Sequence, residues 1–355
     1  MALTATSARA DTPPNIWDLA KNPNAYDQYA RHLQIEREID LVSELTADPQ
    51  DIAKLQIPLS IDHARTIIEE EGPKDVWLRF DEGWVLMKRE QWAQAIPILE
   101  EVAKELASKP FSQEVWERLA ECYVRVERTD DEIRAYDEVL ARAATDTERI
   151  TPLLNQGEAL MRSGAIDTAV EQFREVLRLS AAQVNASSVY TLAQWDLAVA
   201  LDRSGDPRAG LDAARAAVRL DGRYIGVVGG RVVLSSTPDP HVTLYIVPPG
   251  LYAISEQNEE VYFVPNYERD WYLALGYEAL ALEAGVSSSL AHWRDAETHM
   301  MTYITQATLH AADTHKPDTW LDLGQKRLDD IRRRRANAQK QAGPVARDAN
   351  GSLPL

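Results

Sequence analysis

A constant spacing between three small residues is the sequence feature that most restricts how this chain can fold. Gly83, Ala120 and Gly157 follow one another at a step of 37 residues, and each begins the same pattern. The pattern is a small residue, a large apolar residue three positions later, a turn, and then a small residue followed by an aliphatic one. A fixed step of this length indicates a repeat array. The apolar spacing within each unit predicts a pair of antiparallel helices.

Two of the four predicted units depart from strict regularity. The first, over residues 75–109, fits two registers, and in one of them Gly83 marks the close approach of the two helices. In the other register the turn is longer and the core ladder is formed by Trp77, Phe80 and Trp84. In the fourth unit Ala198 takes the place of Gly157 after a step of 41 residues, which implies a longer connection around residues 181–188.

The units resemble the tetratricopeptide repeat family. Its unit of about 34 residues has Trp, Leu, Gly and Tyr in the first helix, Ala and an aromatic residue in the second, and a closing Pro. The third unit matches best, with Gly157 in the first helix, Gly164 in the turn and Phe173 in the second helix. The second unit has Trp116 in the expected place but offers Glu132 where the family has a small residue.

The resemblance covers residues 75–220 and, more weakly, residues 269–336. It implies an all-α fold, a right-handed solenoid of helix pairs, with four pairs over residues 73–222. Residues 15–72 are predicted to form a helical cap, because the terminal repeat of a solenoid has one face without a neighbour. Residues 267–336 are predicted to form a stretched fifth repeat and a capping helix that begins at Asp318.

Two further segments depart from the helical pattern. Residues 223–266 contain β-branched and aromatic runs separated by Gly and Pro, which predict a small β insertion of two or three strands. Such an insertion covers one flank of the solenoid or offers an edge for partner binding. Residues 337–355 are polar and contain Gly and Pro, so this tail is predicted to be disordered.

The charge of the chain argues against one class of partner. It carries 38 Lys and Arg residues and 56 Asp and Glu residues, a net charge of −18. Unspecific binding to nucleic acid needs cationic side chains that replace counterions on the phosphates, so no nucleic-acid partner is expected. The cations of the last helix, Lys326, Arg327 and residues 332–335, are expected to be a solvated helix end that complements the helix dipole. No apolar run approaches the roughly 20 residues of a transmembrane helix, so none is expected.

No motif in the sequence points to catalysis. Phosphate-binding loops, nucleophile elbows, zinc motifs and calcium loops are missing, and the seven histidines are scattered. The single cysteine, Cys122, lies in a helix pattern and is expected in the core. The prediction is therefore a protein that is not an enzyme and has no catalytic residues, cofactor or metal site.

The resemblance implies where a partner would bind. In tetratricopeptide repeat proteins the first helices of successive repeats line a concave groove that receives a peptide or a helix. The side chains expected to line such a groove here are Trp77, Phe80, Trp84, Glu114, Glu117, Glu121, Glu158 and Trp195. The alternative that the tryptophans belong to the core stays open. Clustered glutamates favour a partner that carries Lys or Arg, or an amphipathic one.

The functional hypothesis is a noncatalytic scaffold or assembly module for a protein or peptide partner, of unknown oligomeric state. Residues 1–14 are predicted to be disordered or the remnant of a signal peptide, because Ala8, Arg9 and Ala10 before Asp11 resemble a cleavage site. This favours a periplasmic or secreted protein of a bacterial envelope complex. The alternatives are a cytosolic adaptor or regulator, and an accessory subunit that docks on an enzyme through the β insertion.

Overall fold

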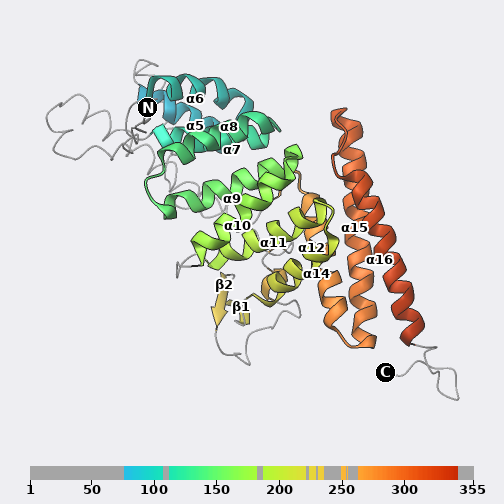
Figure 1. The fold of residues 1–355 in the computed structure, drawn as a ribbon. Coiled ribbons are helices and arrows are strands. Elements are labelled where there is room, and N and C mark those ends of the chain that lie inside the picture. The colour runs from blue at the N-terminus through green and yellow to red at the C-terminus, as the bar shows by residue number, and fades with distance from the viewer. Residues whose placement is uncertain are drawn as a thin grey trace, which may run out of the picture. The chain divides into compact units, whose positions relative to one another are not determined.

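A computed structural model describes most of the repeat region and the C-terminal helices. The described residues are 76–106, 112–181, 187–220, 224–228, 231–235, 249–252, 254 and 263–342, and Figure 1 labels their helices and strands. The chain divides between Pro152 and Leu153 into two compact units, which are described separately. The segments predicted as a signal remnant (1–14) and as an N-terminal cap (15–72) lie outside the described residues.

Unit 1 consists of helices that pack in consecutive pairs. Helix α5 (Val76–Lys88) packs on α6 (Trp92–Leu106), and α7 (Ser112–Arg125) packs on α8 (Thr129–Arg142). Helix α6 also contacts α7, so the two pairs share one core. On α6 the buried residues recur at helical spacing: they are Ala95, Ile96, Leu99, Val102, Ala103 and Leu106. Each helix has one apolar stripe, and these stripes are enough to hold a helix pair against its neighbour.

The turn inside each helix pair has the same backbone geometry. One residue in each of four turns has a positive φ, between 56° and 91°, and the steps between these residues are 37, 37 and 41. The residues are Glu90, Glu127, Gly164 and Gly205. The following amide closes the helix in the manner of a Schellman motif: Gln91 N donates to Leu86 O and Ala165 N donates to Leu160 O, both at 2.9 Å. The sequence period is therefore also a period of the backbone.

The small residue seven positions before each turn lies where two helices meet. A Cβ atom on Gly157 would come within 2.5 Å of the Phe173 ring, and one on Gly83 within 2.6 Å of Leu99. Because Gly83 stands at the same distance from its turn as Gly157 does, the register with Gly83 at the helix contact is confirmed for the first unit. The predicted turn glycine, Gly164, is confirmed as well.

Unit 2 begins within α9 (Asp146–Ser163) and contains further helix pairs. Helix α10 (Ile166–Ser180) packs against α9, and α11 (Ser187–Arg203) pairs with α12 (Pro207–Arg219). The start of α12 is set by Asp206, whose carboxylate accepts from Ala209 N at 3.0 Å, and by Pro207 in the first turn. Helix α14 (Glu268–Glu283) then packs on α12 and on α11.

The C-terminal helices are longer than those of the repeats. Helix α15 (Val286–Thr314) has 29 residues and packs against both α14 and α16 (Leu321–Ala342). Figure 1 shows α15 and α16 side by side, in orange and red. Asp318, the predicted start, accepts from Trp320 N at 2.8 Å just before α16 begins. Helix α16 continues past residue 336 to Ala342, so the first residues of the predicted disordered tail are helical.

The region of the predicted β insertion contains strands and a helix. Strands β1 (Tyr224–Val228) and β2 (Arg231–Ser235) form an antiparallel hairpin in which Tyr224 lies opposite Ser235. Farther along, residues Pro249–Tyr252 form the short helix α13, which contacts α12. The sequence predicts a turn at Pro249 and Gly250, where the structure has this short helix, and the rest of the insertion lies mostly outside the described residues. The insertion as a whole therefore stays a prediction.

The fold class agrees with the sequence. Within the described residues, helices in consecutive packed pairs confirm the predicted helix-pair solenoid. Among these residues no helix is both long and apolar enough to cross a membrane.

The positive φ in the repeated turns can be tested by substitution. Glu90 is exposed and adopts φ 59°, a conformation that costs a residue with a side chain about 1 kcal/mol. We expect Glu90→Gly to stabilise the chain by about 0.5–1 kcal/mol, and Gly205→Ala to destabilise it by a similar amount, since a Cβ there meets nothing within 4 Å. Urea unfolding followed by circular dichroism measures both.

The matched control for that test is Glu101→Gly, in the middle of α6. Glu101 is also exposed, but its backbone is helical, so this variant should lose about 1 kcal/mol. If Glu90→Gly destabilised the chain as much as the control does, the turn would not be under the conformational constraint described here.

Candidate partner-binding surfaces

The predicted acidic side chains lie together on α7. Glu114, Glu117 and Glu121 are spaced by three and four residues, so they share one side of the helix. Glu117 is exposed and the other two are partly exposed. Arg118 pairs with Glu114 at 3.5 Å and with Glu121 at 4.0 Å. On α7 three carboxylates therefore accompany one guanidinium on this side, and we call these three glutamates with Arg118 the α7 face.

Helix α5 lies beside the α7 face and supports it through Trp84. The guanidinium of Arg118 is 4.1 Å from the centre of the Trp84 ring, and Lys88 Nζ is 5.8 Å from it. Contacts of this kind between a cation and an aromatic ring stabilise a structure by about 0.5–1 kcal/mol or more. The orientation of Arg118 is thus fixed from both sides, by two carboxylates and by an indole.

The expectation that Phe80 and Trp84 line an open groove is wrong. Their side chains are only 1% and 5% exposed, and their rings meet edge to face at 6.2 Å. They belong to the core formed by α5, α6 and α7, which includes Leu99 and Leu119. Large aromatic rings gain more from this packing than from solvent exposure, so the core alternative applies. The side chain of Trp77 lies outside the described residues.

Trp195 is also a core residue. Its side chain is fully buried, and the indole Nε1 donates to the carbonyl oxygen of Gly250 at 2.8 Å. Its ring lies against Gly276, where an added Cβ would come within 3.0 Å of it. The groove role predicted for Trp195 is therefore wrong, because α13, far away in the sequence, covers it.

Glu158, the remaining predicted groove residue, is partly exposed on α9. Near it lies the buried Asp196 of α11, whose Oδ1 accepts from the Tyr272 hydroxyl at 2.8 Å. Burial raises the pKa of Asp196, and the negative charge of Glu158 raises that pKa further. Arg162, one helical turn after Glu158 on α9, opposes this rise, so a cation of the chain already lies near the two carboxyl groups.

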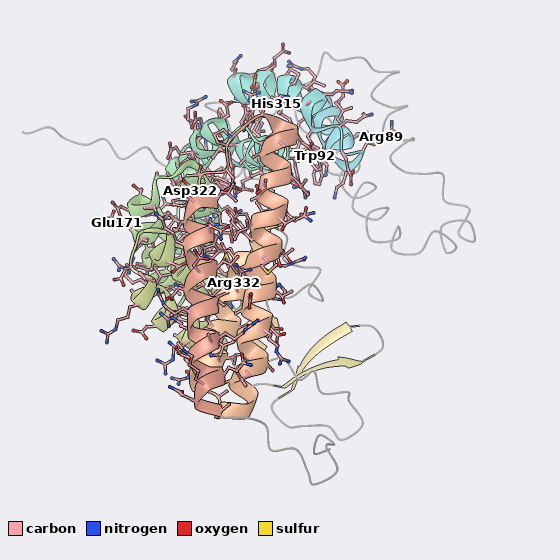
Figure 2. The ribbon with its side chains drawn as sticks, turned by 90° about the vertical axis from the view of Figure 1, so that its right-hand side faces the viewer. Arg89, Trp92, Glu171, His315, Asp322 and Arg332 are labelled. Carbon is pink, nitrogen blue, oxygen red and sulfur yellow. The ribbon has the colours of Figure 1, made fainter. Side chains whose placement is uncertain are left out.

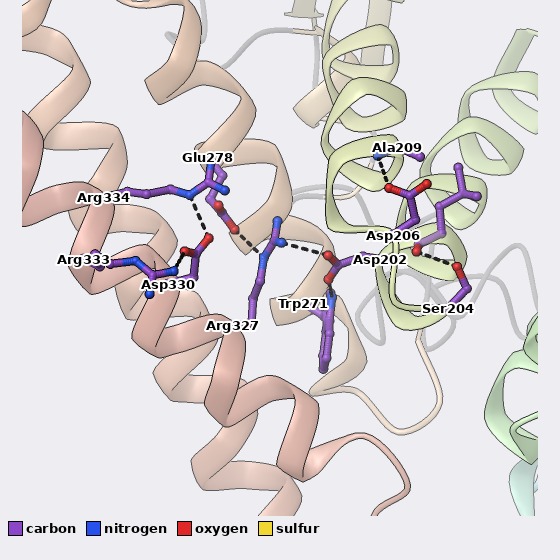
Figure 3. Close-up of polar contacts among 11 residues, drawn as sticks. Asp202, Ser204, Asp206, Ala209, Trp271, Glu278, Arg327, Asp330, Arg333 and Arg334 are labelled. Carbon is purple, nitrogen blue, oxygen red and sulfur yellow. Dashed lines mark hydrogen bonds and ion pairs between the residues drawn. The ribbon is translucent and has the colours of Figure 1, made fainter.

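A buried ionic network joins α11, α14 and α16 (Figure 3). Arg327 of α16 is 5% exposed and lies 2.8 Å from both Asp202 Oδ1 and Glu278 Oε1. The second oxygen of Asp202 accepts from Trp271 Nε1 at 3.0 Å. Breaking such a buried pair is costly because it leaves a charge in the core without compensation.

A second buried pair lies beside this network. Arg203 Nη2 donates to Glu268 at 2.6 Å. The Arg203 guanidinium also lies 4.5 Å from the ring centre of Trp271 and 5.2 Å from that of Trp320. The C-terminal end of α11 is therefore enclosed by α14 and by the segment before α16. At this end of α11 the side chains of Asp202 and Arg203 are therefore covered by the chain itself.

The network has more negative than positive groups. Burial raises the pKa of Glu278 to about 7, the charge of Asp202 adds to this rise, and Arg327 opposes it. Raised carboxyl pKa values are common in active sites, but they also occur in structural networks. The bound oxygen of Glu278 is directed at Arg327, in the core between helices. We therefore assign Glu278 a structural role.

Neither a metal site nor a reactive thiol is found among the described residues. They contain no cluster of three or more His, Cys, Asp or Glu side chains that could hold a metal ion. Cys122 is fully buried as predicted, and burial raises the pKa of its thiol to about 12, so it is a poor nucleophile.

The role of Arg327 differs from the one that the sequence pattern predicts. This residue was expected at a solvated helix end, whereas the structure buries it. A signal was present, because Gly324, Leu328 and Ile331 share a helix face with Arg327 and are buried too. A charged residue on an apolar stripe is expected to find a buried partner of opposite charge.

Comparisons with known proteins agree with the repeat pattern. The family model described as "Tetratricopeptide repeat" matches residues 80–147, which contain most of α5 and all of α6, α7 and α8. The predicted resemblance to this family is thereby confirmed. None of the curated proteins compared matches the chain.

Solved structures match the chain at low sequence identity. One is a putative kinesin light chain from Podosopora anserina with nearly identical TPR-like repeats, 13% identical, with a TM-score of 0.41, covering 62% of this chain and 92% of the other. Another is the apo form of RapI, 11% identical, with a TM-score of 0.48, covering 91% of this chain and 90% of the other. At these identities and TM-scores the likeness carries no information about partners.

The buried network predicts a large effect from a single substitution. Arg327→Met removes the cation that compensates Asp202 and Glu278, and we expect it to destabilise unit 2 by about 3–5 kcal/mol. Arg333→Met is the matched control on the same helix, because its side chain is 72% exposed, and it should change stability by less than about 0.5 kcal/mol. Denaturant unfolding followed by tryptophan fluorescence compares them. Equal effects would show that the buried pair does not support the fold.

The pKa of Glu278 predicts a pH dependence. The folded-state pKa of about 7 lies above the ordinary 4.5, so the folded chain keeps a proton that the unfolded chain releases. The retained proton makes its full contribution to the free energy of unfolding below about pH 4.5. This contribution is lost as the pH rises through about 7. Glu278→Gln removes the titration, so its stability should rise relative to wild type by about 3 kcal/mol over this range.

The groups that face Glu278 in that experiment stay unchanged in the variant: Asp202 from α11, and Arg327 and Arg334 from α16. Because Asp202 interacts with Glu278, the difference between the two proteins reports the coupled titration of this pair. Parallel curves of unfolding free energy against pH would contradict the raised pKa.

Proposed function

We propose that this chain, which carries tetratricopeptide repeats, is a noncatalytic binding module that holds a protein or peptide partner. The observation that carries the proposal is the α7 face, where three carboxylates and one arginine stand on a rigid, fully packed helix core. A binding surface gains affinity when its side chains are already ordered, because less conformational entropy is lost on binding. Arg118 is ordered in this way by Trp84, Glu114 and Glu121.

The chemistry of the α7 face favours a basic partner. Its surplus of negative charge attracts a segment that carries Lys or Arg, and exposed charges mainly increase the association rate and the specificity. Because Phe80 and Trp84 are buried, the partner would contact the glutamates and Arg118 rather than a row of aromatic rings. Glu158 in unit 2 has the same sign of charge and is proposed as a contact of the same kind.

The cellular setting of this module stays a prediction. A bacterial envelope complex and a cytosolic adaptor remain the two candidates, and the residues that bear on the choice, Ala8 to Asp11, lie outside the described part of the chain. Docking on an enzyme partner through residues 223–266 likewise stays a prediction. None of these settings changes the chemistry proposed for the α7 face.

The proposal predicts a charge-dependent interaction. A fluorescent amphipathic peptide with Lys along one side should bind the full-length chain, and the same peptide with Glu in place of each Lys should not bind at the α7 face. Replacing Glu114, Glu117 and Glu121 with Gln should weaken binding of the Lys peptide by at least about tenfold, because neutral amides remove the attraction but keep the side-chain shape. Fluorescence anisotropy at low and high salt measures the affinities.

The matched control removes three carboxylates from second helices of the same unit. The exposed residues chosen for this purpose are Glu101, Asp130 and Asp137. If neutralising this second set weakened binding as much as neutralising the first set does, the attraction would come from net charge and the α7 face would not be the site.

A further inference from the structure

The outer side of α15 carries an uncharged stripe. Its residues are Thr298, Met301, Thr302, Thr305 and Leu309, which recur at helical spacing. This side lies opposite the residues of α15 that face the core, such as Ala296, Met300 and Tyr303. Met301 is 44% exposed and Leu309 is 54% exposed, which is unusual for large apolar side chains. We call these five residues the α15 stripe.

The threonines make the stripe more apolar than their hydroxyl groups suggest. The hydroxyl of Thr302 donates to Thr298 O at 3.0 Å, and that of Thr305 donates to Met301 O at 2.8 Å. With the hydroxyls bonded to the helix backbone, the methyl groups are left to contact a partner. An open recess of about 310 Å³ lies over this part of the helix and is lined by Thr298, Met301, Thr302, Thr305 and Gln306.

One border of the stripe is basic. Arg332 of α16 lies on the side of that helix next to α15 (Figure 2), with Nη2 at 3.6 Å from Met301 Sδ. Arg332 and Arg335 share the single carboxylate of Glu297, and Arg333 and Arg334 share that of Asp330. Arg332 and Arg335 thus reach α15, whereas Arg333 and Arg334 pair along their own helix, and Arg334 also lies near the buried Glu278. Beside the stripe two guanidinium groups share one carboxylate, which is a local surplus of positive charge in a chain whose net charge is −18.

We propose that the α15 stripe and the neighbouring arginines of α16 form a second docking surface, which takes an acidic amphipathic helix. An apolar row on that helix would pack over Met301, Leu309 and the threonine methyl groups, as in the binding of an amphipathic helix along a shallow groove. Its carboxylates would pair with Arg332 and Arg335, and guanidinium groups bind carboxylates with two parallel hydrogen bonds. The stripe, from residue 298 to residue 309, is about 18 Å long, roughly three turns of a partner helix.

The charge of the chain favours this occupant over two others. An anionic membrane surface would attract the arginines, but it would repel a molecule with a net charge of −18. A second copy of the chain would bring Arg332 and Arg335 of each copy against one another if the two stripes met face to face. A short acidic helix contacts only the stripe and its basic border, so salt screens it from the more distant carboxylates of the chain, whereas an extended membrane surface faces many of them.

The peptide pair described for the α7 face also tests this surface, with the opposite sign. The Glu peptide should bind full-length protein, and Leu309→Glu together with Met301→Glu should weaken its binding by at least about tenfold, since both substitutions put a negative charge against it. The matched control is Leu282→Glu, because Leu282 on α14 is similarly exposed at 47%. Circular dichroism of each variant verifies that the helices are intact.

Substitution of the arginines separates the contribution of charge to peptide binding from that of the apolar contact. Arg332→Gln should weaken binding of the Glu peptide and reduce its salt dependence, whereas Arg178→Gln on α10, an arginine that is 65% exposed, should do neither. The α7 variant with three glutamines should still bind the Glu peptide. Binding of the Glu peptide at the α15 stripe does not depend on the α7 face, so either proposal can fail without the other.

Several outcomes would overturn the proposal. One is a Glu peptide that fails to bind, or that binds with the same affinity to the Met301 and Leu309 variant. Another is binding of the Lys peptide that depends on the stripe residues, because charge complementarity with the arginines could not explain it. Stripe-dependent cosedimentation with phosphatidylserine vesicles would show a membrane surface instead. Stripe-dependent dimerisation, measured by light scattering, would show a second copy.

Discussion

The repeat depends on one local constraint, which is the fixed distance between a small residue and a left-handed turn. In each pair the small residue lets the two helices touch, as Gly157 does with the ring of Phe173. Seven residues later the backbone turns at a positive φ, at Gly164 in that pair. The contact sets how closely the helices approach, and the turn sets where the second helix starts. Each pair can then present its remaining apolar stripe to the next one.

The same constraint explains which parts of the structure could be predicted. Helix pairs, turns and register follow from spacings within about 40 residues, so a single sequence is enough to find them. The fate of Trp195 was not predictable in this way, because its partner, Gly250, is 55 residues away and belongs to a segment that the sequence pattern did not identify as helical. Arg327 is a similar case, since its carboxylate partners are on α11 and α14. Burial of single side chains depends on such distant contacts.

Burial also changes what the repeats of unit 2 can offer to a partner. Asp202 and Arg203 lie at the C-terminal end of α11, and Glu268, Trp271 and Arg327 cover them. A charged network can fill such a position only if each group finds a partner, because an uncompensated charge in the core is costly. The C-terminal helices thus act as a specific cap on the array. Their buried pairs fix where α16 can lie.

That placement has a consequence for the outer surface. With Arg327 held in the core, the helix periodicity directs Arg332 toward α15, where it reaches Glu297 and Met301. The buried network therefore determines the position of the basic border beside the α15 stripe. The two proposed surfaces then differ in sign: carboxylates dominate on α7 and guanidinium groups dominate along α16. A chain with this arrangement can distinguish a basic partner from an acidic one by location, because each surface repels the partner of the other.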